Sequence, residues 1–279
     1  MDDTLTPIVY PGVPRGAYGE VQVRADGEVM AAAGEALATA DEAIALTQEA
    51  LAPSGEAGPP AAEPLPRAGV VLAVIARPGQ ESADLGALLY GFRREGASLA
   101  LLCLTRGEAS SQNVTCERLE TIRPFELQVA AGLLGVSSVA MSDYADGGLR
   151  LAPVAALTER VRRAIRAYQP DLLLVVDPAV AGDPDEVQVA RAACLAAEAC
   201  GLPVVARTGP GARSGWMIDL GADAAAARAI QRCAAQAHVS QSAAWPQLLR
   251  RLDRLGHRER LRWLVPPAVY SRLRGATPA

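Results

Sequence analysis

The feature that most constrains the fold is a regular alternation of short apolar segments with longer amphipathic ones, which begins after Gly69. The apolar segments are of strand length and lie at residues 70–76, 99–104, 139–141, 172–176 and 204–206. The segments between them are of helix length and lie at residues 81–95, 118–134, 157–168 and 186–200. Strands and helices in this order predict right-handed βαβ units. We therefore expect an α/β, Rossmann-like three-layer αβα fold with a mostly parallel sheet.

The C-terminal third departs from this alternation. Residues 216–220 predict a strand, residues 224–237 a helix and residues 247–264 a second helix. The second helix would carry a run of six arginines: Arg250, Arg251, Arg254, Arg258, Arg260 and Arg262. Such a run indicates a solvated basic face, and the sharper alternative is contact with an anion or a phosphate.

Residues 1–68 are expected to be an N-terminal extension to a domain at residues 69–279. Residues 27–51 predict a helix, because Met30, Leu37, Ile44 and Leu51 recur every seven residues on one stripe. Residues 52–67 hold five prolines among Ala, Gly and Glu, which is typical of a linker. The stripe predicts docking of this helix on its own domain, and a homo-oligomer or an active paralogue is the alternative partner.

Composition argues against two classes of partner. The net charge of −4 and the aromatic content of 4% disfavour nucleic acid. No apolar run is long enough to span a bilayer, and the acidic first residues lack a signal-peptide layout. We therefore expect a cytoplasmic protein that contacts no membrane. A nucleotide-binding module is also disfavoured, because neither GxGxxG nor a P-loop occurs.

In a parallel sheet of this kind the site lies beyond the carboxyl ends of the strands. The residues there resemble the motifs of the PIG-L/LmbE family of zinc-dependent N-acetylglucosaminyl deacetylases. The first family motif, Ala-His-Pro-Asp-Asp-Glu, is matched by Ala-Arg-Pro-Gly-Gln-Glu at residues 76–81. The second, Gly-His-Pro-Asp-His, is matched by Gly-Asp-Pro-Asp-Glu at residues 182–186. The second segment also predicts the cap and first turn of the helix that follows it.

Further segments match the family in order and spacing, from about residue 70 to residue 259. They are the turn at residues 104–108, Arg123 to Glu126, the Asp-Gly turn at residues 143–147, residues 237–241 with His238, and Glu259. The resemblance implies the family fold, described as LmbE-like.

The resemblance also locates the family's zinc site, and this chain departs from it. Its three zinc ligands fall on Arg77, Gln80 and Glu186, its catalytic base on Gly79, and the histidine thought to steady the intermediate on Asp183. A guanidinium offers only donors and cannot ligate a metal. We therefore expect no zinc, no other cofactor, no metal ligands and no catalytic residues of the family type.

The leading functional prediction is a non-catalytic, zinc-less member of the family. Its pocket would bind an amino sugar or a phosphorylated small ligand, or the protein would act as a regulatory partner. The candidate ligand-binding residues are Arg77, Gln80, Glu81, Arg106, Arg123, Asp146, Asp183, Asp185, Glu186 and His238. We further expect Arg77 to pair with Glu186 or Asp183 across the former metal site, and Glu81, Asp185, Arg123 and Glu126 to hold loops together.

The alternative is a divergent hydrolase, an N-deacetylase acting on amino-sugar amides. An acidic group at the strand ends would hold a metal through oxygen ligands, as Mg²⁺, Mn²⁺ or Ca²⁺ prefer. That group would comprise Glu81, Asp177, Asp183, Asp185 and Glu186. Metal-free acid/base chemistry by a carboxylate beside Arg77 is the other form of this alternative.

Overall fold

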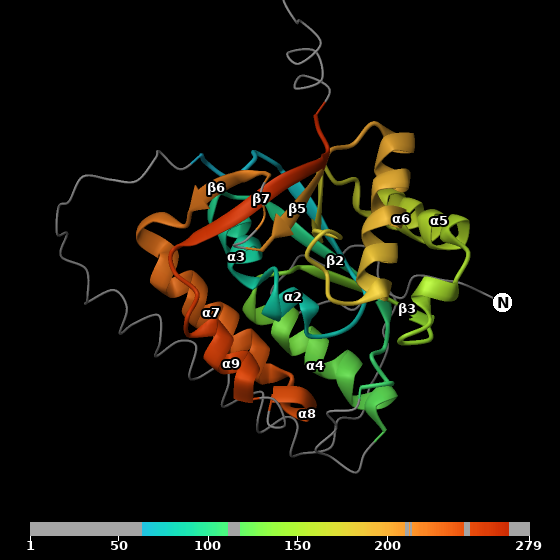
Figure 1. The fold of residues 1–279 in the computed structure, drawn as a ribbon, viewed down its shortest axis with the longest axis horizontal. Helices are drawn as coiled ribbons and strands as arrows, with labels where there is room; N and C mark the ends of the chain where they lie inside the picture. The colour runs from blue at the N-terminus through green and yellow to red at the C-terminus, as the bar shows by residue number, and fades with distance from the viewer. Residues whose placement is uncertain (1–62, 111–117, 210–211, 213, 243–245, 268–279) are drawn as a thin grey trace, which may run out of the picture.

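The fold is built on one seven-stranded sheet, seen in a computed structural model that describes residues 63–110, 118–209, 212, 214–242 and 246–267. The strand order is β3-β2-β1-β4-β5-β7-β6. Five strands pair in parallel: β1 (Val70–Ile75), β2 (Ser98–Thr105), β3 (Ser138–Tyr144), β4 (Leu172–Val176) and β5 (Val204–Thr208). The expected α/β fold with a mostly parallel sheet is confirmed (Figure 1).

The central strands are buried on both faces, which explains their continuous apolar sequence. On β1, Val71, Ala73 and Ile75 face one apolar cluster, while Leu72 and Val74 face the other. A strand covered by helices on both faces has no solvent side, so it needs no alternation of polar residues.

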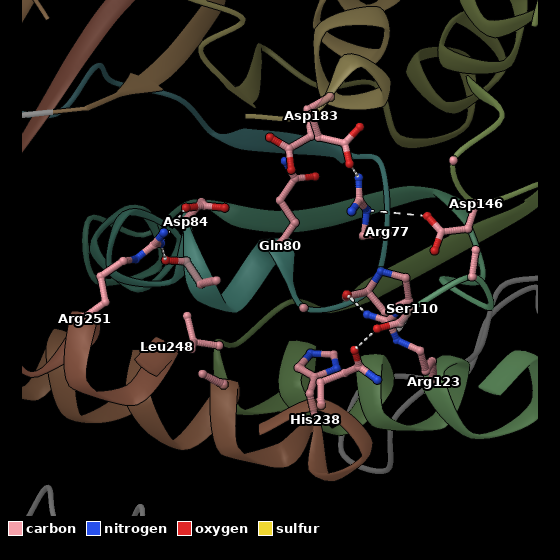
Figure 2. Close-up of a pocket in the computed structure, with 18 residues that line it drawn as sticks. Arg77, Gln80, Asp84, Ser110, Arg123, Asp146, Asp183, His238, Leu248 and Arg251 are labelled. Carbon is pink, nitrogen blue, oxygen red and sulfur yellow. Dashed lines mark hydrogen bonds and ion pairs between the residues drawn. The ribbon is translucent and has the colours of Figure 1, made fainter. Parts of the chain in front are cut away.

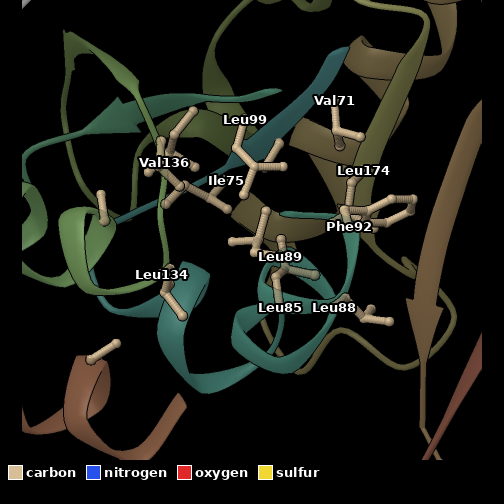
Figure 3. Packing of buried hydrophobic residues seen from close by; sticks show 14 of the residues in the cluster. Val71, Ile75, Leu85, Leu88, Leu89, Phe92, Leu99, Leu134, Val136 and Leu174 are labelled. Carbon is tan, nitrogen blue, oxygen red and sulfur yellow. The ribbon is translucent and has the colours of Figure 1, made fainter. Parts of the chain in front are cut away.

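Helices cover both faces of the sheet (Figure 1). One face packs against α3 (Gly86–Arg94), α4 (Leu119–Leu133) and α7 (Ala224–Ala237). The other packs against α5 (Val154–Tyr168) and α6 (Pro184–Cys200). Leu85, Leu88, Leu89 and Phe92 fill the space between α3 and the sheet, all at 1% exposure or less (Figure 3). Three layers follow from these two apolar interfaces.

The predicted helix at residues 247–264 is wrong. Residues 246–252 form the short helix α9 (Pro246–Leu252), and β7 (Arg258–Val265) then runs antiparallel between β5 and β6 (Trp216–Asp219). Glu259 and Leu261 are buried while their neighbours are less so, which is the period of two that defines a strand. The arginine spacing resembled a helix face, but Arg258, Arg260 and Arg262 share one face of a strand.

The predicted helix at residues 81–95 is split in two. It consists of α2 (Gln80–Ala83) and α3, with Asp84 and Leu85 between them. The predicted cap of α6 is confirmed, since the Asp183 carboxylate accepts the Asp185 amide at 2.8 Å and Pro184 is the first helical residue. The remaining short elements are η1 (Leu149–Leu151), η2 (Gly221–Asp223) and α8 (Val239–Ser242).

Most of the predicted N-terminal extension, including the helix at residues 27–51, lies outside the described residues. Glu63 is described, and its amide donates to the Met217 carbonyl at 3.0 Å on the edge strand β6. None of the helices in the described part of the chain combines the length and apolar composition that crossing a bilayer requires.

Candidate functional site

A pocket of about 450 Å³ opens where the carboxyl ends of β1 and β4 meet helices α7 to α9 (Figure 2). Seven of the ten candidate residues line it: Arg77, Gln80, Arg123, Asp146, Asp183, Glu186 and His238. They are separated by up to 161 positions along the chain, from Arg77 to His238, and come together because parallel strands end at one edge of the sheet.

Arg77 cross-links two sides of the pocket. It follows β1, and its guanidinium binds Asp183 at the start of α6 and lies 3.5 Å from Asp146 after β3. Burial alone would lower the pKa of Arg77, but the hydrogen bond and charge of Asp183 raise it above its ordinary value. Burial opposes ionisation of Asp183 as well, and the bond to Arg77 nevertheless lowers the pKa of that carboxyl. Both groups are therefore charged. Of the two partners predicted for Arg77, Glu186 and Asp183, the structure pairs it with Asp183.

Arg123, on α4, binds two loops that border the pocket and holds them together. It is 3% exposed, and its guanidinium donates to the Pro78 carbonyl at 2.6 Å and to the Gly107 carbonyl. Gly107 has a φ of +70°, a conformation that favours glycine, and this turn aims its carbonyl at Arg123. Burial lowers the pKa of Arg123, but a guanidinium stays protonated.

A buried pair of hydrogen-bonded side chains, Glu81 and His238, forms the floor beside Arg123. Glu81, which is fully buried, lies 2.6 Å from Nε2 of His238 and also accepts the Gly79 amide at 2.8 Å and the Ser82 hydroxyl at 2.6 Å. Burial opposes ionisation of Glu81, yet the charge and hydrogen bond of His238 lower its pKa. Glu81 therefore acts behind the pocket wall, where it holds the loop at Gly79.

The second buried glutamate secures the segment that carries His238. Glu126 on α4 accepts the Ser240 amide at 2.6 Å and the Ser240 hydroxyl at 2.7 Å. Its carboxylate also lies 4.0 Å from Nδ1 of His238. The predicted loop-holding role of Glu81, Glu126 and Arg123 thus has a direct geometric basis.

Glu186 differs from the other pocket carboxylates, because no hydrogen bond or ion pair to it occurs among the described residues. Burial, then the charges of Asp84 and Asp183, raise its pKa to about 7, against the opposing charges of Arg77 and Arg251. Its carboxyl group thus changes charge near neutral pH.

Replacement of Glu186 by glutamine is expected to remove a pH-dependent loss of stability. Since the folded pKa of about 7 exceeds the ordinary value of 4.5, this group stabilises the fold fully below pH 4.5, and that stability is lost as pH rises through 7. After allowance for solvent screening, Glu186→Gln should raise the melting temperature at pH 8 by about 2–4 °C and leave it nearly unchanged at pH 5. Melting curves from pH 5 to pH 8 measure this.

The matched control is Glu198→Gln, which removes an exposed carboxylate from the same helix α6. Its melting temperature should follow that of the unmodified protein at every pH. Parallel curves for Glu186→Gln and the unmodified protein would contradict the raised pKa.

Three candidate residues lie outside the pocket lining. Glu81 is behind it, Arg106 pairs with the exposed Asp143 at 2.6 Å, and Asp185 is buried and accepts the Arg150 amide at 2.9 Å. The predicted acidic group does not converge either, because Asp177 forms a two-fold ion pair with Arg262 at 2.8 and 2.5 Å. The arginine run was also predicted to contact an anion or a phosphate. For Arg262, the anion is the carboxylate of Asp177 in the same chain.

The pocket also contains residues that sequence reasoning did not assign to the site. Asp84 is bound by Arg251 at 2.7 Å and lies 3.5 Å from Arg207, while Ser110 donates to Gln241 at 2.5 Å. Asp84 follows Gln80 by four positions, so helical spacing could have placed both on one face. Arg251 was recognised only as part of the basic run.

The sheet order and the strand-end pocket with its polar lining define the class of protein as a Rossmann-like α/β protein with a polar pocket at the carboxyl ends of its strands. Residues 72–197 match the family model PIG-L, described as GlcNAc-PI de-N-acetylase. This segment of the chain is therefore similar to the PIG-L family of deacetylases, as its motifs predicted. Among curated proteins, none matches the sequence of this chain.

Solved structures share the fold at low sequence identity. N,N'-diacetylchitobiose deacetylase from Pyrococcus horikoshii has a TM-score of 0.60 at 18% identity, over 73% of this chain and 86% of its own. The conserved protein TT1542 from Thermus thermophilus has a TM-score of 0.58 at 21% identity, over 70% and 94%. GalB, the 4-carboxy-2-hydroxymuconate hydratase from Pseudomonas putida, has a TM-score of 0.57 at 18% identity, over 71% and 97%.

The residues at the family's zinc positions do not fit zinc. Arg77 brings a positive charge that is bound to two aspartates, and the amide oxygen of Gln80 already accepts the Ala76 amide at 2.8 Å. Glu186 alone offers a free oxygen ligand, whereas catalytic zinc requires three protein ligands. Within the described residues, no group of three or more His, Cys, Asp or Glu side chains is arranged to hold a metal ion.

Proposed function

We propose that the pocket binds a small polyhydroxylated ligand of the amino-sugar class and does not hydrolyse it by zinc chemistry. One observation carries the proposal: Arg77 stands at a family zinc-ligand position and is bound to Asp183 and Asp146. A guanidinium held there by two carboxylates supplies the cross-link and positive charge of the site but no Lewis acid.

The pocket lining suits a ligand rich in hydroxyl groups. Gln80 offers a donor, Asp84 and Glu186 offer acceptors, and Leu248 provides an apolar surface. A few polar groups that converge on a concave surface are typical of a small-molecule site. The diacetylchitobiose deacetylase among the structural neighbours acts on an amino sugar by its name, which supports this ligand class for the shared fold.

The other expectations from the sequence remain proposals. A phosphorylated ligand, a regulatory role beside an active paralogue, and a homo-oligomer formed through the helix predicted at residues 27–51 all rest on the sequence. Absence of a cofactor and a cytoplasmic location rest on it too.

A divergent hydrolase without zinc is the second candidate function. The observation that favours it is Glu186, a pocket carboxyl with no bound partner in the described residues and a pKa of about 7, which suits general acid/base work. GalB is a hydratase by its name, so the fold is compatible with chemistry other than deacetylation.

Metal content and turnover, measured together, test the proposal. The protein is purified without chelator or added metal, analysed by elemental mass spectrometry, and assayed for acetate release from N-acetylglucosamine and N,N'-diacetylchitobiose. We expect less than about a tenth of an equivalent of any metal, because a catalytic zinc ion requires three protein ligands and this pocket does not offer them. We also expect no acetate release, with or without added Zn²⁺, and saturable binding of an amino sugar by calorimetry.

Near-stoichiometric metal with turnover would overturn the proposal. Metal-free turnover that Glu186→Gln abolishes and Glu198→Gln retains would instead establish the second candidate.

A further inference from the structure

One wall of the pocket carries an excess of negative charge. We call it the acidic wall; its polar groups are Gln80 and Asp84 from the α2 region and Asp183 and Glu186 from the start of α6. Apart from His238, the charged residues that line the pocket are three arginines (Arg77, Arg123 and Arg251) and four acidic residues (Asp84, Asp146, Asp183 and Glu186). Arg207 also lies 3.5 Å from Asp84, but it is paired with Glu259 at 3.1 Å. The pocket lining therefore has one acidic group more than it has guanidinium groups.

Both arginines beside the acidic wall are already engaged. Arg77 binds Asp183 and lies 3.5 Å from Asp146, and Arg251 binds Asp84 at 2.7 Å and the Ala83 carbonyl at 2.9 Å. Neither can turn to Glu186 without releasing a carboxylate. The group left without a cationic partner is therefore Glu186, which faces the cavity and is only partly ionised at pH 7 until a cation binds beside it.

Gln80 provides a second and independent indication of a ligand. This side chain is 7% exposed, yet it lines the pocket and extends toward Asp183 (Figure 2). Its Oε1 accepts the Ala76 amide at 2.8 Å, which fixes the amide orientation. In the described part of the chain its Nε2 donates to no group, so one donor of this largely buried side chain is left open toward the cavity.

We infer that the acidic wall binds the primary ammonium group of a small polar ligand, with Glu186 as its counter-ion and the Gln80 amide as donor to a neighbouring hydroxyl oxygen. This inference rests on the proposed function and specifies its ligand: a free amino sugar, in preference to its N-acetylated or phosphorylated form. An ammonium group supplies the missing positive charge together with three donors.

The same wall disfavours the competing ligands. An N-acetyl group is uncharged and leaves the negative charge in place. A phosphate would meet Asp84, Asp183 and Glu186, and the pocket arginines that could bind it are held by carboxylates or, for Arg123, by backbone carbonyls. Ligand selection here thus depends on whether the half-buried carboxylate of Glu186 gains a cationic partner.

The test compares three sugars on the full chain by isothermal titration calorimetry at pH 7: glucosamine, N-acetylglucosamine and glucose. Glucosamine should bind about ten-fold more tightly than either of the others, as expected for one charge-assisted interaction. Glu186→Gln should reduce that advantage to less than about two-fold, because the counter-ion is removed and the shape is kept. Glu198→Gln, on the exposed part of the same helix, should retain it.

The outcomes separate the inference from the proposed function. Equal binding of the three sugars, or an advantage that survives in Glu186→Gln, would overturn the inference alone. Competition by Mg²⁺ or Ca²⁺ at micromolar concentration would overturn it in favour of a metal site. Failure of all three sugars to bind would overturn the proposed function as well. Melting curves of both variants verify that each is folded.

Discussion

Replacement of His238 by alanine is expected to destabilise the fold by about 3 kcal/mol, because it leaves a buried carboxyl group without its hydrogen-bond partner. Nε2 of His238 lies 2.6 Å from Glu81, which is fully buried and would lose this hydrogen bond. Urea denaturation at pH 7 measures the loss. Because the pKa of Glu81 is lowered by His238, the stabilisation is present above the ordinary pKa of 4.5 and is lost at lower pH.

The chain provides its own control for this variant. His257 is the only other histidine; its side chain is 60% exposed and lies 3.7 Å from Asp219. His257→Ala should change stability by no more than about 0.5 kcal/mol, as is usual for an exposed pair. Equal effects of the two substitutions would show that the Glu81–His238 pair does not support the floor of the pocket.

Replacement of Arg123 by alanine is expected to cost about 2–4 kcal/mol and to abolish ligand binding, because two buried carbonyl groups lose their donor. These carbonyls belong to Pro78 and Gly107, in the loops that follow β1 and β2. Without Arg123 the two loops lose their common anchor, and the lining they contribute is no longer positioned. Urea denaturation and titration with glucosamine measure the two effects.

Two further variants make this prediction specific. Arg106→Ala, in the same loop as Gly107, removes a pair whose side chains are 45% and 76% exposed, and should cost about 1 kcal/mol or less. Arg123→Lys keeps the charge but not the fork that reaches two carbonyls, so it should recover only part of the stability. Full recovery by lysine would show that charge, and not the double hydrogen bond, holds the loops.

The loss of the family's base position extends to the backbone. Gly79 has a φ of +97°, which side-chain-bearing residues rarely adopt, and its amide is held by Glu81 at 2.8 Å. An aspartate at this position would therefore be strained, even though its Cβ would meet Arg123 and His238 only at ordinary contact distances of 3.9 and 4.0 Å. The backbone at this position thus suits glycine better than the aspartate of the family motif.

Much of the architecture was determined by the sequence. Continuous apolar runs such as residues 172–176 suit only strands covered on both faces, and their alternation with helices leaves little choice besides a parallel sheet. Parallel strands end at one edge, so motifs that follow β1 and the cap of α6 had to meet there. The residue types alone also showed that Arg77 and Gly79 cannot perform zinc chemistry.

Tertiary structure decided which charged groups meet. Asp177 and Glu186 are both acidic, and they lie close in sequence, directly after β4 and in the first turn of α6. Asp177 forms an ion pair with Arg262 on β7, whereas the carboxyl group of Glu186 has no such partner in the described residues. The arginine run became a strand at residues 258–265 because Leu261 and Glu259 are buried there against distant segments. Ion-pair choice and local period depend on neighbours far away in the chain, and a single local segment does not contain that information.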